Sequence, residues 1–222
     1  MEQTTNYRAG SILGYAISGL ILSIVGSIIR SLAIRAEGAS IGFYLMIAGM
    51  VLTYIFYYKF ASKCSILGPR YGGPAFGLFW ISLVGSVVSI ASYFTDLTGN
   101  MLVAFITFGL GIANFILLWV LGSRLKNEFL GETHSVGVWM MLVVKTILWT
   151  IFGAAMLLLL SVLLGSVSSN FAAIVGGVFG AFAAIGVAIW LFIAWIILLV
   201  KMNNFYRLDF SGYNEEPPVF PE

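Results

Sequence analysis

Polar and ionisable side chains inside apolar stretches are the residues of this sequence with the clearest capacity for chemistry. Lys145 lies well inside one such stretch, about nine residues after Val136. An ammonium group in hydrocarbon is energetically expensive, so it marks a candidate contact with an anion, a lipid phosphate or a partner carboxylate. Alternatively, its long aliphatic stem carries the charge back toward the membrane surface, or the amine makes a structural hydrogen bond.

A second group of polar candidates is uncharged. Ser82, Ser86 and Ser89 recur at helical spacing, and Asn114 lies in the next apolar stretch. Such groups could line a polar path for a solute. They could equally hold helices together, because Ser can donate to its own helix backbone and Asn commonly bonds between helices. With Lys145, these four residues form the candidate intramembrane polar site.

Sequence motifs for catalysis and for metal or cofactor binding are absent. The chain has one cysteine and one histidine, Cys64 and His134, both expected in loops, and it has no Walker, nucleophile-elbow or zinc-protease motif. No Asp or Glu lies inside an apolar stretch, which disfavours proton-coupled or sodium-coupled transport. We therefore predict no catalytic residue, no metal site, no cofactor, no enzymatic activity and no nucleic-acid partner.

The elements that must position these residues are membrane-spanning helices. Hydrophobic residues make up 60% of the chain and charged residues 9%, and the mean hydropathy is +1.02. A soluble domain is about half apolar and about a quarter charged, and a helix crosses a bilayer with about 20 apolar residues. We predict one all-α polytopic bundle over residues 1–208 and an acidic, Pro-rich cytoplasmic tail over 209–222, with spans at 11–29, 41–58, 75–94, 101–122, 136–165 and 171–200.

Basic residues are distributed unevenly between the two sides of these spans. Eight Lys and Arg residues fall on the side of the termini, whereas only Arg30 and Arg35 fall on the other. Because such residues are retained on the cytoplasmic side, both termini are expected in the cytoplasm. The membrane itself is expected to be the plasma membrane of a prokaryote. Residues 59–74 and 123–135 are then expected to be basic cytoplasmic loops that dock partners or the acidic tail.

Small residues recur every four positions in the last predicted span, at Gly176, Gly180 and Ala184. This spacing lets two helices approach closely. The facing helix could belong to the same bundle, to a protein partner or to a second copy of the chain. These residues are the candidate helix-packing interface.

Each pair of predicted spans ends in a basic residue followed by a Phe-containing exit, as in Tyr58-Lys59-Phe60 and Asn204-Phe205-Tyr206-Arg207-Leu208. This layout resembles uncharacterised archaeal integral membrane families built from three helical hairpins with Gly-rich spans. The resemblance covers nearly the whole chain, and it implies three tandem hairpins without implying an activity. Basic and aromatic residues at membrane interfaces are an alternative explanation of the pattern.

Two functional hypotheses follow. In the first, the chain is a structural or accessory subunit of a larger membrane assembly, held in the lipid bilayer and bound to protein partners or to itself through small-residue faces and the tail. In the second, it is a small channel or transporter for a neutral or anionic solute that passes Asn114, Lys145 and the serines. The first is favoured because the chain lacks catalytic residues and its non-cytoplasmic loops are short.

Overall fold

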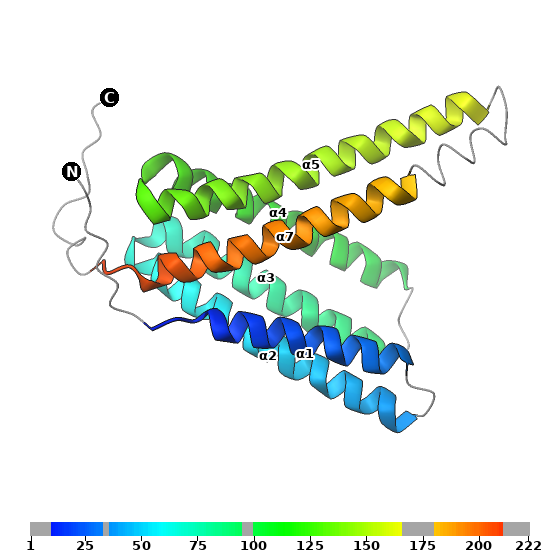
Figure 1. Cartoon of the computed structure of the whole chain (residues 1–222), viewed down its shortest axis with the longest axis horizontal. Helices are drawn as coiled ribbons and strands as arrows, with labels where there is room; N and C mark the ends of the chain where they lie inside the picture. The colour runs from blue at the N-terminus through cyan, green and yellow to red at the C-terminus, as the bar shows by residue number, and fades with distance from the viewer. Residues whose placement is uncertain (1–9, 33–35, 95–99, 166–179, 211–222) are drawn as a thin grey trace.

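The computed structural model describes residues 10–32, 36–94, 100–165 and 180–210, whose regular elements are α-helices (Figure 1). Six helices of this described part are long and apolar enough to cross a membrane. The prediction of an all-α, six-span bundle is therefore confirmed, and the chain is a multi-pass integral membrane protein. The helices are α1 (Leu13–Leu32), α2 (Ala36–Ile66), α3 (Pro69–Phe94), α4 (Met101–Glu128), α5 (Gly131–Gly165) and α7 (Gly180–Arg207).

The helices continue beyond the apolar stretches at one end of the bundle. We call this the core end; it contains the starts of α1, α3 and α5 and the ends of α2, α4 and α7, and the opposite end is the far end. The expectation of long loops at 59–74 and 123–135 is wrong, because only Leu67–Gly68 and Phe129–Leu130 separate the helices there. The expected loop positions of Cys64 and His134 are wrong for the same reason. The added turns stay helical because their apolar side chains join the core.

One glycine and two prolines shape the turn between α2 and α3 and the first turns of α3. Gly68 has a φ of 110°, a backbone conformation that glycine adopts without strain, and Pro69 begins α3, where a backbone N–H is not needed. Pro74 lies inside α3 and cannot donate to the carbonyl of Arg70. Arg124 of α4 donates to that carbonyl from Nη1 instead. The acceptor freed by the proline thus joins α3 to α4.

Helices α1 and α2 approach each other more closely than a side chain would allow. Gly19 of α1 faces Gly49 of α2, and Gly26 of α1 faces Gly42 of α2. The two glycines of each helix are seven residues apart. A Cβ atom on Gly26 would lie 2.5 Å from the Gly42 carbonyl oxygen, and one on Gly42 would lie 2.6 Å from the Gly26 carbonyl oxygen. Without a hydrophobic driving force between helices in lipid, such backbone contact supplies the packing energy.

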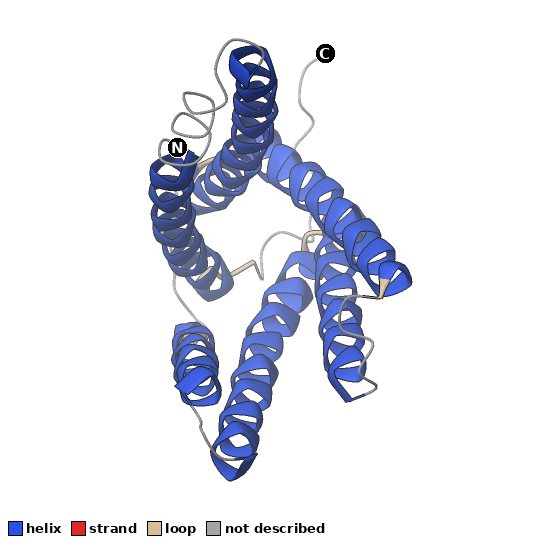
Figure 2. Cartoon of the chain, turned by 90° about the vertical axis from the view of Figure 1, so that its right-hand side faces the viewer, coloured by secondary structure: helices blue, strands red, loops and turns tan. Residues whose placement is uncertain are grey.

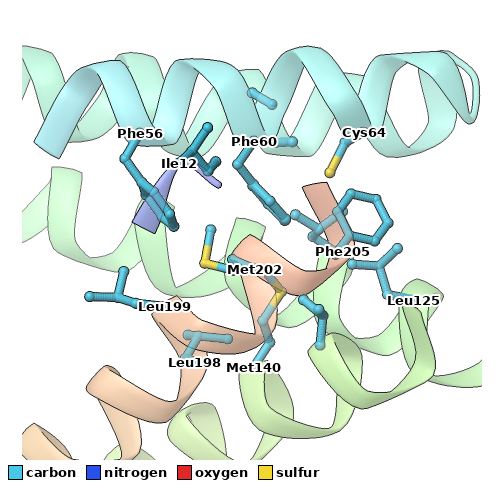
Figure 3. Close-up of a cluster of buried hydrophobic side chains, with 14 of the residues drawn as sticks. Ile12, Phe56, Phe60, Cys64, Leu125, Met140, Leu198, Leu199, Met202 and Phe205 are labelled. Carbon is cyan, nitrogen blue, oxygen red and sulfur yellow. The ribbon is translucent and has the colours of Figure 1, made fainter. Parts of the chain in front are cut away.

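The buried hydrophobic core lies near the core end and draws on every helix (Figure 3). Phe56 and Phe60 of α2 meet Met202 and Phe205 of α7, and the Phe60 and Phe205 ring centroids are 5.4 Å apart. Side chains of α4 and α5 close the cluster from the other side. Its fully buried large members are Phe56, Phe205, Leu121, Leu125, Met140, Leu198, Val136 and Cys64.

Consecutive helices pack side by side around a ring, as Figure 2 shows from the far end. The main packing partner of α7 is α5, the described helix that precedes it in the chain. α7 touches α1 and α2 with only a few residues. Toward the far end, α5 and α7 diverge from α1 and α2 (Figure 1). The division into three tandem hairpins stays a prediction, because α4 packs against α5 as well as against α3.

Ion pairs reinforce the ring at the core end. Glu128 at the end of α4 accepts a hydrogen bond from the Tyr71 hydroxyl and lies 3.0 Å from an Arg70 guanidinium nitrogen. Glu132 at the start of α5 lies 3.5 Å from Lys201 Nζ of α7. These carboxylates connect α3 to α4 and α5 to α7, beyond the apolar stretches of these helices.

The buried position of Cys64 gives a direct test of the core end. The chain has one cysteine, and its side chain is fully buried. We expect N-ethylmaleimide to modify Cys64 more than about a hundredfold more slowly in mild detergent than in denaturing detergent, because modification requires opening of the core. Ser65→Cys in a Cys64→Ser background is the matched control, since Ser65 is exposed. Equal rates at the two positions would contradict the packing of the core end.

Candidate functional site

The structure places the five predicted polar-site residues in three separate environments. Ser86 and the carbonyl group of Ser82 contact Tyr54 of α2, and Ser89 bonds to the backbone of its own helix. Asn114 of α4 lines a pocket between α4, α5 and α7, and Lys145 lies on the outer side of α5. They therefore do not converge on one polar site.

The three predicted serines of α3 take part in contacts to α2 or to their own helix. The Tyr54 hydroxyl of α2 lies 3.0 Å from the Ser82 carbonyl oxygen, to which it can donate, and it also contacts Ser86 Oγ. Ser89 Oγ donates to the Gly85 carbonyl oxygen at 2.9 Å. These bonds are those expected of helix packing and of a hydroxyl returned to its own backbone.

Lys145 is exposed and faces away from the bundle. Val143 and Ile147, two residues to either side, face inward and line a pocket, so Lys145 lies on the opposite side of α5. Its outward neighbours are apolar, with Trp149 72% and Phe152 58% exposed. Within the described residues, no hydrogen bond or ion pair engages its amine. A lysine near the centre of a transmembrane helix costs about 2.5–3.5 kcal/mol on insertion scales.

Asn114 lies in the wall of an apolar pocket of about 460 Å³ between α4, α5 and α7. Its side-chain Oδ1 is buried and has no hydrogen-bond partner in the described part of the chain. A buried acceptor left without a donor costs about 1–3 kcal/mol. The pocket is lined by Gly111, Asn114, Phe115, Leu118, Val143, Ile147, Leu191, Phe192 and Trp195.

Two tryptophans of α7 help to fix the wall of this pocket. Trp195 packs on Tyr57 of α2, with ring centroids 6.2 Å apart. Five residues earlier, Trp190 Nε1 donates to Thr146 Oγ1 of α5 at 3.3 Å. These contacts hold α7 against α5 and α2, and so they set the width of the pocket beside Asn114.

The predicted small-residue interface is only partly within the described residues, because Gly176 lies outside them. A Cβ atom on Gly180 would meet no atom within 4 Å, and Ala184 is exposed. The described portion of this face thus packs on no other described helix. It is open to lipid or to another chain.

Asn203 joins the end of α7 to the start of α1 at the core end, and no pattern in the sequence singled it out. Its Oδ1 accepts hydrogen bonds from Ser11 Oγ at 3.0 Å, Ile12 N at 2.9 Å and Leu13 N at 3.0 Å. A residue near the end of α7 therefore caps the start of α1, as a local N-cap residue would. The available signal was a pair of amides, Asn203 and Asn204, between the apolar residues Met202 and Phe205.

A smaller, basic pocket of about 250 Å³ lies between α2 and α7 and is lined by Lys59, Ser62, Lys63, Ile66 and Tyr206. Lys59 Nζ lies 5.6 Å from the centroid of the Tyr15 ring, and Lys63 Nζ lies 5.1 Å from that of Phe210. These are cation–π distances. The acidic tail over 209–222 that was expected to dock on basic segments falls almost entirely outside the described residues.

In the described part of the chain, the other reactive side chains lie in separate environments. Cys64 is buried in the core, His134 Nδ1 lies 2.6 Å from the Lys126 carbonyl oxygen, and Glu132 pairs with Lys201. Among the described residues, no group of three His, Cys, Asp or Glu side chains could hold a metal ion. The two features left as functional candidates are the outward-facing Lys145 and the pocket at Asn114.

No protein-family model, no curated protein and no solved structure matches this chain.

Proposed function

We propose that this protein is a structural or accessory subunit of a larger membrane assembly, without catalytic activity of its own. The observation that carries the proposal is the position of Lys145, which projects from the apolar outer face of α5. A charge placed there is compensated best by a carboxylate of a neighbouring subunit. The exposed small-residue positions Gly180 and Ala184 offer a second surface for close helix contact.

The partner's carboxylate must come from a different protein. Glu132, on the same helix as Lys145, is about 20 Å away along the axis, and no apolar stretch of this chain contains Asp or Glu. A second copy therefore brings no acid to the depth of Lys145. Snorkelling is the competing explanation, but the ammonium group must then reach back over about 13 Å of apolar helix.

We further propose that the core end lies in the cytoplasm of a prokaryote. This end carries most of the Lys and Arg residues of the described chain, including Arg124, Lys126, Lys201 and Arg207. The positive-inside rule favours that orientation. The resemblance to archaeal families favours a prokaryotic plasma membrane.

A small transporter for a neutral or anionic solute is the second candidate function, and the pocket at Asn114 is the observation that favours it. The separation of Lys145 and the serines from that pocket weighs against a shared path. A transporter should support solute flux alone in liposomes, and Asn114 substitutions should then change the flux while leaving any assembly intact.

Lys145→Met is expected to release the partner protein while the chain itself stays folded. Loss of one member of a buried ion pair weakens association by about a hundredfold or more. Native mass spectrometry of the tagged chain, extracted gently from its own membrane, measures the stoichiometric partner, and the slow modification of Cys64 reports the fold.

Two variants serve as controls for this experiment. Lys145→Arg keeps the charge and should retain most of the partner, and Leu148→Met changes an outward neighbour without changing charge. A chain that is recovered without partners, and whose solute flux depends on Lys145, would contradict the subunit proposal.

A further inference from the structure

We propose that the pocket between α4, α5 and α7 binds a neutral amphiphile from the bilayer, and that a hydroxyl group of this ligand donates a hydrogen bond to Asn114 Oδ1. The ligand class is a long apolar body with one uncharged O–H donor. The proposal is independent of the partner proposed for Lys145, which lies on the opposite face of α5.

The size and lining of the pocket favour an apolar occupant over water. One water molecule would be enough to satisfy the Asn114 oxygen, yet the pocket holds about 460 Å³, and a water molecule occupies about 30 Å³ of liquid. The other lining residues are aliphatic or aromatic except for Gly111. Water filling such a space would lack hydrogen-bond partners, whereas apolar cavities stay dry and accept apolar ligands.

The chemistry at Asn114 selects the polar group of that ligand. Its Oδ1 is a buried acceptor without a donor, so it is satisfied by an O–H group and not by an ether or ester oxygen. No Lys, Arg, Asp or Glu lines the pocket. A charged headgroup would therefore lose its hydration without compensation, and the ligand must be neutral.

The depth of the pocket favours a ligand that comes from the bilayer. Asn114 lies about 20 Å from either end of α4, which places it near the middle of the apolar span. The pocket is partly open and not a sealed void. A molecule dissolved in the hydrocarbon is present at this depth.

The test uses a photoactivatable diazirine analogue of hexadecanol as the probe, with the full chain reconstituted in liposomes. Labelled peptides are mapped by mass spectrometry, and labelling is competed with hexadecanol or with hexadecyl methyl ether, which lacks the donor. We expect labels on the pocket walls and competition by the alcohol about five- to tenfold stronger than by the ether, as one hydrogen bond provides. In Asn114→Leu the alcohol and the ether should compete equally.

A second pair of variants tests the location without removing the amide. Gly111 lines the pocket and has open space at its Cβ position, so Gly111→Leu should narrow the pocket beside Asn114 and weaken the labelling. Gly109 also has open space but lies outside the lining, so Gly109→Leu should keep the labelling. Equal competition by alcohol and ether in the unmodified chain, or equal labelling of the Gly111→Leu and Gly109→Leu variants, would overturn the proposal.

Discussion

Asn203→Ala is expected to lower the free energy of unfolding by about 2–3 kcal/mol. The substitution removes the acceptor of three hydrogen bonds and leaves the buried N–H group of Ile12 without its partner, while Leu13 N keeps only the longer bond to Ser11 Oγ at 3.3 Å. Loss of an N-cap costs about 0.5–2 kcal/mol, and unsatisfied buried donors add to that cost. Because α7 meets α1 with only a few residues, this amide is also a main closure of the ring.

The measurement is the unfolding transition in a denaturing detergent titration, with Cys64 modification as a second readout. Asn204→Ala is the matched control, because the neighbouring amide makes no hydrogen bond to another described residue. Asn203→Asp should recover much of the loss, since a carboxylate accepts the same bonds and is favoured at the start of α1 by the helix dipole. Equal stability of the two alanine variants would show that the cap contributes nothing.

Asn203 also illustrates what the sequence could not provide. Hydropathy and helix length predicted six spans, because the bilayer imposes one length scale on every helix. The partner of Asn203 lies about 190 residues away in the chain, and no local pattern encodes that distance. The extension of α2 to Ile66 was missed for a related reason, since its last turns are helical through packing of Phe60 and Cys64 in the core.

The role of the candidate site residues stays a prediction. The high cost of polar groups in hydrocarbon directed attention to positions such as Lys145 and Asn114, but composition does not give the direction in which a side chain points. That direction depends on which face of α5 contacts α4 and α7. Only the packed structure separates an outward lysine from an inward asparagine beside a pocket.

Gly137→Ala is expected to destabilise the protein by about 3 kcal/mol through one added methyl group. Its Cβ atom would overlap the Lys126 backbone nitrogen and would lie 2.7 Å from both the Gly122 carbonyl oxygen and the Leu125 carbonyl carbon. All three atoms belong to the backbone of α4, so no side-chain rotation relieves the contact. The helices must separate, and overpacking of this kind costs about 1–3 kcal/mol or more.

The position of Gly137 makes this cost hard to avoid. Only Phe129–Leu130 separate α4 from α5, so the two helices cannot move apart freely beside their turn. Separation would also strain the contact between His134 Nδ1 and the Lys126 carbonyl oxygen. Detergent-induced unfolding and faster Cys64 modification should both report the loss.

Gly153→Ala on the same helix is the matched control, because a Cβ atom there meets nothing within 4 Å. Its effect should be small or slightly stabilising, since Ala favours a helix over Gly by about 1 kcal/mol. Both substitutions make the same chemical change in α5, so the difference between them isolates the cost of the close approach to α4. Equal effects of the two would mean that the backbones of α4 and α5 are not in contact at Gly137.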